Sequence, residues 1–255
     1  RLTYATGIAI RDAAEKINEK LKETAAGLLG CRADHLAIKD RKVYSIYEAE
    51  RKSIEWEKVV EVAVNTVGSL AAMGHFSPPR RRGFDLTSGK RAQGANIGHS
   101  PTFGFSCQIF EVDVDLETGK IKVNRVTESG DMGTMINPMA ADGQVEGSIV
   151  YNLGACLYEE QFFDKDGIHL NPNFQDYKMP TIMDMPEMDI NTLTDSYDPT
   201  APFGAKETGE GAVQPTFPAL VNAIHDAIGI RFTEVPITPE KVLKALREKK
   251  EATGK

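Results

Sequence analysis

The segment 105–128 constrains the fold of this chain more than any other part of its sequence. Residues 105–115 and 120–128 both alternate apolar with polar side chains, which is the period of a half-buried strand. The stretch Leu116-Glu117-Thr118-Gly119 between them supplies a glycine-containing turn. The two stretches are therefore predicted to form an antiparallel hairpin, and any fold of this chain has to contain that sheet.

Apolar residues with helical spacing predict a set of helices around this hairpin. These stretches are 7–29, 59–67, 143–157, 215–229 and a last helix that starts at Thr238-Pro239-Glu240. Gly30 is a natural stop for the first helix, and Ser53 is predicted to cap the second one. In the helix 143–157, Gly147 and Gly154 permit the close approach of another backbone.

Shorter signals complete the predicted architecture. Residues 35–46 indicate a small hairpin, and residues 231–235 indicate a short strand. The methionine-rich stretch 179–188 is interpreted as irregular core filling, with an adaptable ligand surface as the alternative. Helices mixed with an antiparallel sheet, without a regular β-α-β rhythm, predict the α+β fold class.

A long connection suggests how the chain is divided. Residues 77–100 are rich in Pro, Gly and Arg and indicate an irregular loop. We therefore expect a first α+β subdomain over residues 1–100, which includes this loop, and a second over residues 101–255 that carries the active-site loops. The two subdomains could interleave.

Charge and cysteine content exclude several functions. The 37 acidic residues outnumber the 30 basic ones, so the chain has no global positive field to attract nucleic acid or anionic membranes. The three cysteines, Cys31, Cys107 and Cys156, form no C-x-x-C pair and are predicted to be buried thiols. No targeting segment or apolar run of membrane-spanning length is present, so the cytoplasm is the predicted location.

The segment Gly204-Ala205-Lys206-Glu207-Thr208-Gly209-Glu210-Gly211 is the densest unusual stretch. Its glycines allow backbone conformations that other residues avoid, and it leads into a predicted helix, as binding loops often do. Glu210 stands between two glycines and is a candidate general base if a cleft desolvates it and raises its pKa. By composition alone, an exposed turn with solvated charges is the favoured alternative.

A second candidate segment surrounds Gln144. This glutamine lies between glycines at the predicted start of a helix, where its amide can both donate and accept hydrogen bonds. The five histidines show no metal-ligand spacing, so no side-chain metal site is predicted.

Five segments together resemble the molybdopterin-binding subunit of the xanthine dehydrogenase and aldehyde oxidase family. They are the start Arg1-Leu2-Thr3-Tyr4-Ala5-Thr6-Gly7, the strand 103–115 with its E-V-D-V-D-x-x-T-G ending, the N-P-x-x-x-x-G-Q-x-x-G motif at 137–147, the G-A-K-x-x-G-E segment from Gly204, and the ending 237–243. The resemblance runs through most of the chain. It covers only the C-terminal part of a full molybdenum subunit, and it implies the fold of a molybdenum hydroxylase cofactor domain.

The resemblance also implies roles for individual residues. Glu210 corresponds to the active-site glutamate, which takes a proton from the water-derived nucleophile at molybdenum. Gln144 corresponds to a glutamine that hydrogen-bonds near the metal centre. The backbone of Gly209 and of Arg1, Leu2 and Thr3 corresponds to pterin contacts. The pterin dithiolene holds molybdenum in this family, so no side chain of this chain is expected to bind the metal.

The reaction and its partners remain expectations at this point. The resemblance implies hydroxylation of an N-heterocycle, an aldehyde or a similar carbon. The form Glu207-Thr208-Gly209-Glu210-Gly211 looks closest to the 4-hydroxybenzoyl-CoA reductase branch, which removes a phenolic hydroxyl from an aryl-CoA thioester. A cofactor-free assembly module is a further alternative.

The family resemblance implies that this chain works only within a larger assembly. The expected partners are the N-terminal part of the molybdenum subunit, an iron–sulfur subunit and a flavin (FAD) subunit, because this chain lacks cysteines for clusters. The pterin could carry a cytosine dinucleotide. This chain alone is expected to be inactive.

Overall fold

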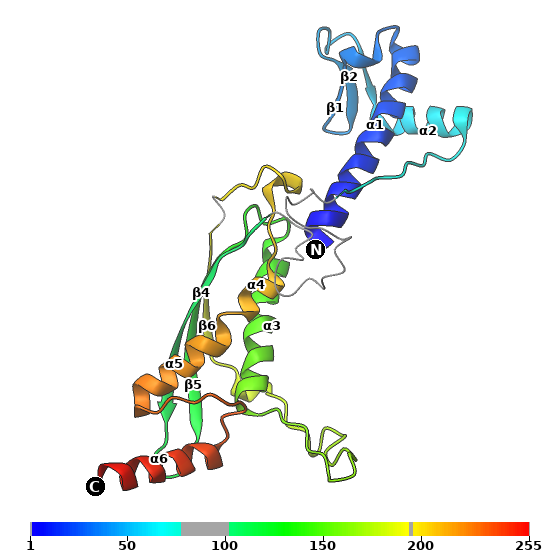
Figure 1. The fold of residues 1–255 in the computed structure, drawn as a ribbon. Helices are drawn as coiled ribbons and strands as arrows, with labels where there is room; N and C mark the ends of the chain where they lie inside the picture. Colours follow the sequence, from blue (N-terminus) through cyan, green and yellow to red (C-terminus); the bar gives the residue numbers. More distant parts are fainter. Residues whose placement is uncertain (1, 78–101, 194–195, 255) are drawn as a thin grey trace, which may run out of the picture. The chain divides into compact units, whose positions relative to one another are not determined.

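The computed structural model describes residues 2–77, 102–193 and 196–254. The chain divides into two compact units, Arg1–Pro101 and Thr102–Lys255 (Figure 1). Most of the predicted loop 77–100 lies outside the described residues, as does Arg1. No helix in the described parts of the chain is both long and apolar enough to cross a membrane.

The first unit consists of two helices and a small antiparallel sheet. Its elements are η1 (Leu2–Thr6), α1 (Gly7–Leu29), η2 (Ala33–His35), β1 (Leu36–Lys39), β2 (Lys42–Ser45), β3 (Ser53–Glu55) and α2 (Trp56–Val67). The strand order is β1-β2-β3. The predicted helix 7–29 and the small hairpin are confirmed. Gly30 ends α1 with a left-handed φ of 60° and bonds back to the carbonyl of Ala26, as a glycine stop should.

The core of the first unit lies between α1, α2 and the sheet. Its buried members are Leu21, Ala25, Leu36, Val43, Val59 and Ala63.

The predicted cap at Ser53 is wrong. Ser53 pairs with Tyr44 in a third strand, and α2 starts after Glu55 without a side-chain cap. Strand pairing with β2 therefore determines where α2 begins.

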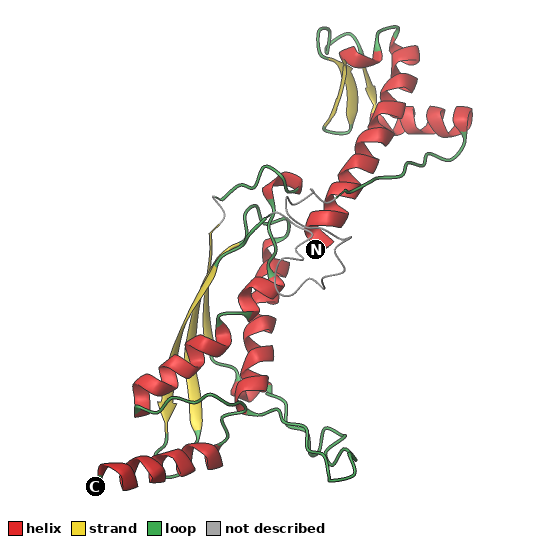
Figure 2. Cartoon of the chain, viewed as in Figure 1, coloured by secondary structure: helices red, strands yellow, loops and turns green. Residues whose placement is uncertain are grey.

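The second unit packs helices on one face of a mixed sheet. Its elements are β4 (Ser106–Val114), β5 (Ile121–Asp131), α3 (Pro138–Leu157), η3 (Ile182–Asp184), β6 (Glu187–Leu193), η4 (Pro202–Gly204), α4 (Gly209–Val213), α5 (Thr216–Ile228) and α6 (Pro239–Thr253). Figure 2 shows that the segment between α3 and β6 is mostly loop.

The sheet of the second unit contains the predicted hairpin and one strand that was not predicted. β4 and β5 pair antiparallel with Phe110 opposite Val126, which confirms the hairpin. β6 pairs parallel to β5, with Met188 opposite Val126. The interpretation of residues 179–188 as core filling is wrong for Met179 and Met183, which are exposed, whereas Met188 packs against the core.

The core of this unit lies between the sheet and the helices α3 and α5 (Figure 1). Alternate residues of both hairpin strands face it, with one register shift at Glu111/Val112. They include Phe110 and Val126, and α3 and α5 contribute Ile149 and Leu220. The outer face of β4 is exposed, and Cys107 lies on it. The prediction of three buried thiols is therefore wrong for Cys107, while Cys156 is buried and this burial raises its pKa to about 11.

The start of α3 and the segment 231–235 differ from the sequence prediction. α3 starts at Pro138 rather than near Gly143, because Asn137 caps it: the Asn137 Oδ1 atom accepts a hydrogen bond from the Ala140 N–H at 3.1 Å. The predicted strand 231–235 is wrong, since these residues form no strand. α5 and α6 are confirmed, and Thr238 caps α6.

The two faces of α2 allow a matched stability test. Val59 is fully buried and Val64 is 43% exposed, although both lie within the same helix. We expect Val59→Ala to lower the free energy of unfolding by about 2 kcal/mol, because it removes buried apolar surface and leaves a cavity. Val64→Ala should be nearly neutral. Urea unfolding followed by circular dichroism measures both, and equal effects would contradict the packing described for α2.

Candidate functional site

The predicted binding loop contains α4, a helix of only five residues. Such a short helix leaves its last four carbonyl groups without a partner inside the helix. Side chains from outside the helix donate to three of its carbonyl groups. The Ser148 hydroxyl donates to the Gly209 carbonyl at 2.8 Å, Gln108 Nε2 donates to the Ala212 carbonyl at 2.9 Å, and Asn152 Nδ2 donates to the Val213 carbonyl.

The side chains that hold α4 come from two rigid elements. Ser148 and Asn152 are one turn apart on α3 and therefore share a face of that helix. Gln108 lies on the core-facing side of β4, and its Oε1 accepts a hydrogen bond from the Thr216 hydroxyl at 2.7 Å. All four side chains are buried, so their polar groups depend on these hydrogen bonds. Buried hydrogen bonds thus attach α4 to α3, β4 and the start of α5.

Gln144 and Gly209 meet at the exposed side of α4. Gln144 lies one turn before Ser148 on α3. Its carbonyl oxygen is 2.7 Å from the Ser148 hydroxyl, whose single proton is shared between this carbonyl and that of Gly209. A Cβ atom on residue 209 would lie 3.0 Å from Gln144 Oε1, so the glycine lets the amide sit against the backbone. The structure therefore brings together two residues that are 65 positions apart in the sequence.

Glu210 follows Gly209 in the first turn of α4. Its side chain is exposed in the described structure. The burial that the sequence argument expected around this carboxylate is not provided by the described residues of this chain.

The first half of the glycine-rich segment is anchored rather than a free turn. The Lys206 N–H donates to the Met132 carbonyl at 2.9 Å, and the Thr134 N–H donates to the Gly204 carbonyl at 3.1 Å. The Lys206 side chain is 9% exposed, and its ammonium forms an ion pair with Asp131 at 2.5 Å. The favoured alternative of an exposed turn with solvated charges is therefore wrong for Lys206, although Glu207 and Glu210 are exposed.

The remaining predicted contacts lie in the first unit. Leu2 and Thr3 are both exposed in η1, whereas Tyr4 is buried and packs edge-on against Phe76. The burial of Tyr4 holds the start of the chain in place. Leu2 and Thr3 thus present their side chains to solvent from a turn that its own unit orders.

Sequence reasoning missed the residues that support α4. Ser148, Asn152 and Gln108 carry a recognisable signal, since each is a polar residue at a core-facing position of its helix or strand. Such positions indicate polar groups that need a buried partner. The pattern does not say which backbone they hold.

The described residues contain no group of three or more His, Cys, Asp or Glu side chains arranged to hold a metal ion. The groups that meet here are the exposed Gln144 amide and the backbone at Gly209, and the next residue along the chain is the exposed Glu210. This arrangement can donate and accept hydrogen bonds and can take up a proton.

Comparisons with known proteins give a consistent result. The family model of the molybdopterin cofactor-binding domain matches residues 1–186. The putative xanthine dehydrogenase molybdenum-binding subunit XdhA of Escherichia coli K12 is 29% identical over 243 residues, which are 95% of this chain and 30% of that protein. The nicotine 6-hydroxylase large subunit of Paenarthrobacter nicotinovorans is 31% identical over 254 residues, 97% of this chain and 29% of that protein.

A solved structure shares the fold. The CO dehydrogenase from Oligotropha carboxidovorans matches with a TM-score of 0.77 at 24% identity, over 97% of this chain and 29% of the solved chain. This chain therefore spans about a third or less of the length of the relatives it matches.

The support of α4 can be tested by removing one hydrogen bond without changing the size of the side chain. Asn152→Leu leaves the Val213 carbonyl buried without its donor, so we expect a loss of about 1–3 kcal/mol in the free energy of unfolding. Asn18→Leu on the exposed face of α1 is the matched control. Thermal and urea unfolding measure both, and a neutral Asn152→Leu would show that the carbonyl is satisfied in another way.

Proposed function

The chain belongs to the molybdopterin cofactor-binding domains of the xanthine dehydrogenase family, and from this premise we propose that it forms part of the active site of a molybdenum-dependent oxidoreductase. The observation that carries the proposal is the contact of the Gln144 amide with Gly209, beside the exposed Glu210. It joins two of the five segments that carry the family resemblance, and buried side chains hold them in place.

The residues present fit the cofactor. The pterin brings its own sulfur ligands for molybdenum, so the protein has to supply hydrogen-bonding groups rather than a His or Cys cluster. The neutral amide of Gln144, next to the backbone of Gly209, supplies such hydrogen-bonding groups. We propose that Gln144 and Gly209 contact the cofactor, together with Arg1, Leu2 and Thr3.

Each residue of this surface has a defined task in the proposal. When bound, the cofactor supplies the molybdenum centre that accepts two electrons from the substrate. Glu210 accepts, at a carboxylate oxygen, the proton of the water-derived nucleophile. Gln144 orients its neighbours through Nε2 as donor and Oε1 as acceptor. The rest of the enzyme, which this chain does not contain, would desolvate Glu210 and raise its pKa into the range of a working base.

The substrate is proposed as an N-heterocycle, an aldehyde or a similar electron-poor carbon, which is hydroxylated. The name of one relative, a nicotine 6-hydroxylase, supports the oxidative direction for an N-heterocycle. The reductive dehydroxylation of an aryl-CoA thioester takes second place, because it rests only on the form of residues 206–211 and the preceding Pro202-Phe203.

The partners are proposed from the length of the relatives. This chain matches about 30% of the xanthine dehydrogenase subunit, so the remaining pterin contacts and the substrate channel belong to the rest of such a subunit. Three scattered cysteines cannot hold an iron–sulfur cluster, which places the clusters, and a flavin, on partner chains or domains. We further propose that the two compact units are the two predicted subdomains, 1–100 and 101–255.

Replacing the proposed base tests the function directly. In the complete enzyme, Glu210→Gln keeps the shape of the side chain but cannot accept a proton, so kcat should fall about a hundredfold to ten-thousandfold. Molybdenum content per protomer should stay unchanged. Glu207→Gln, an exposed glutamate of the same segment, is the control. An active Glu210→Gln enzyme would overturn the assigned role.

Two glycines two residues apart provide a test of cofactor binding. Gly209→Ala places a Cβ 3.0 Å from Gln144 Oε1 and displaces the amide, whereas in Gly211→Ala the nearest atom, Glu207 Oε1, is 3.7 Å away. We expect only Gly209→Ala to lower the molybdenum and pterin content of the purified enzyme. Because the exposed amide can move, the free energy of unfolding should change by less than about 1 kcal/mol. Equal cofactor content in both variants would contradict the proposed contact.

A further inference from the structure

Lys206 and Asp131 form an ion pair that the proposed function does not use. The Lys206 side chain is 9% exposed and that of Asp131 is 11% exposed, so water reaches little of either. Lys206 Nζ lies 2.5 Å from Asp131 Oδ2 and donates to the Ser196 hydroxyl oxygen at 2.7 Å. The other carboxylate oxygen, Asp131 Oδ1, accepts the Gly133 N–H at 3.1 Å. Both charged groups therefore have partners within this unit.

The largely buried position of this ion pair needs a reason other than folding stability. Moving two opposite charges out of water costs free energy that their attraction only roughly returns, so apolar side chains of similar size would serve the core as well. Apolar side chains do not supply direction, whereas an ammonium and a carboxylate hold each other in a defined geometry. The pair is therefore suited to fixing the position of the segments that carry it.

The ion pair crosses a backbone contact that is only one residue pair long. Gly133 and Ala205 form an isolated antiparallel bridge. Two backbone hydrogen bonds of 2.9 and 3.1 Å close it, between residues 132–134 and residues 204–206. A long strand has a row of side chains that fixes its register, but a single bridge does not. The ion pair joins the same two segments and so fixes which of their residues lie opposite each other.

Glycines bring the two backbones together at this bridge. Gly133 has a φ of 59°, and a Cβ atom on it would collide with the Gly204 carbonyl oxygen. The two segments can approach this closely only because no side chain lies between them. The bridge thus lacks side chains of its own to interlock, and the neighbouring ion pair is its side-chain contact.

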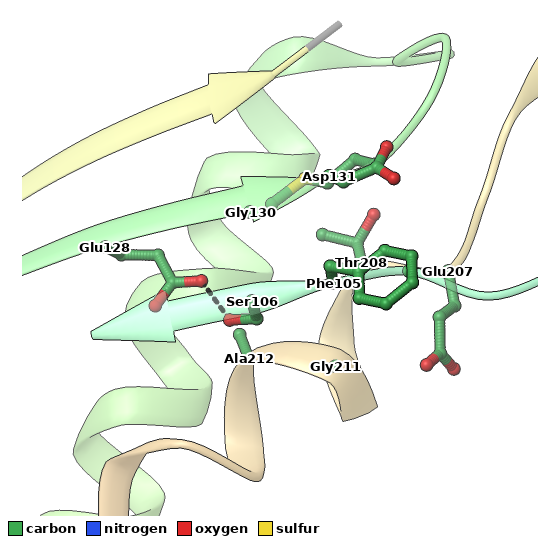
Figure 3. Close-up of a pocket in the computed structure, with 11 residues that line it drawn as sticks. Phe105, Ser106, Glu128, Gly130, Asp131, Glu207, Thr208, Gly211 and Ala212 are labelled. Carbon is green, nitrogen blue, oxygen red and sulfur yellow. Dashed lines mark hydrogen bonds between the residues drawn. The ribbon is translucent and has the colours of Figure 1, made fainter. Parts of the chain in front are cut away.

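The bridge lies directly before α4. Lys206 stands four residues before Glu210 in the sequence. Figure 3 shows Asp131 at the end of β5 with Thr208 next to it, and both line the same small cavity. The side chains of α3 and β4 described above hold α4 itself. The two residues 207–208 therefore connect one fixed point at the end of β5 with another at α4.

We propose that Lys206 is a positioning residue, whose ion pair with Asp131 fixes the register of the bridge and thereby the position of Gly209 and Glu210. The end of β5 then determines where the first turn of α4 lies. Only the catalytic consequence rests on the proposed function, because it requires Glu210 to act from this segment.

A neutral double variant separates positioning from folding stability. Lys206→Met keeps most of the side-chain volume, and Asp131→Asn keeps an oxygen that can accept the Gly133 N–H. Each single variant leaves one largely buried charge unpaired, whereas the double variant leaves none. We expect the Tm of the complete enzyme to fall in both single variants and to return to within about 2 °C of the wild type in the double variant.

Hydrogen exchange in the complete enzyme reports how firmly the segment is held. We expect the amides of residues 207–213 to exchange about tenfold faster in the double variant and in both single variants, because the register contact is lost in all three. Lys244→Met removes an exposed ion pair with Glu248 on α6 and is the control, with wild-type exchange in this segment. Wild-type exchange in the double variant would overturn the proposal. The double variant decides this even if a single variant fails to fold.

Kinetics give a second readout. In the double variant, kcat per bound molybdenum should fall about tenfold with KM changed less than about twofold, because the base is displaced while the substrate pocket remains. A role in folding stability alone would leave both at their wild-type values once the Tm is restored, and this outcome would also overturn the proposal. Exchange needs no turnover, so an active Glu210→Gln enzyme would overturn the proposed function without changing the exchange result.

Discussion

The site depends on how the carbonyl groups of the short helix α4 find hydrogen-bond donors outside the helix. A five-residue helix leaves its last four carbonyls without an internal partner, and side chains of α3 and β4 donate to carbonyls along it. Ser148, Gln108 and Asn152 donate to three of them, so the helix is held by buried hydrogen bonds rather than by its own length. If these donors were apolar, the hydrogen bonds that hold α4 with Gly209 against Gln144 would be lost.

The same constraint explains why the core of the second unit changes character along the sheet. At one end the hairpin faces the helices with apolar residues such as Phe110 and Val126, and burial of that surface stabilises the unit. At the other end Gln108, Glu128 and Ser106 face the core instead. Burying polar groups there costs folding free energy. Their hydrogen bonds are directional, however, and can hold α4 in one position. The stable end and the functional end of the sheet are therefore different.

The parts of the fold that could be predicted are those with a local cause. The 7–29 helix, the β4-β5 hairpin and α6 follow from periodicity, turn residues and caps within each segment. β6 could not be predicted because its pairing with β5 is parallel and joins residues about sixty positions apart. Ser53 had the chemistry of a cap, but pairing with Tyr44 placed it in a strand. Cys107 is exposed because the alternation of β4 puts it on the outer face.

The sequence by itself determined the α+β class, the family resemblance and the residue types of the site, since Gln144, Gly209 and Glu210 stand in recognisable local motifs. Only the tertiary structure decided that Gln144 meets Gly209, that Lys206 pairs with Asp131, and that Ser148, Asn152, Gln108 and Glu128 surround α4. The physical reason is the range of the interactions. Periodicity, caps and turns act over a few residues, whereas a buried donor and the carbonyl that it satisfies can lie on any two segments that the core brings together.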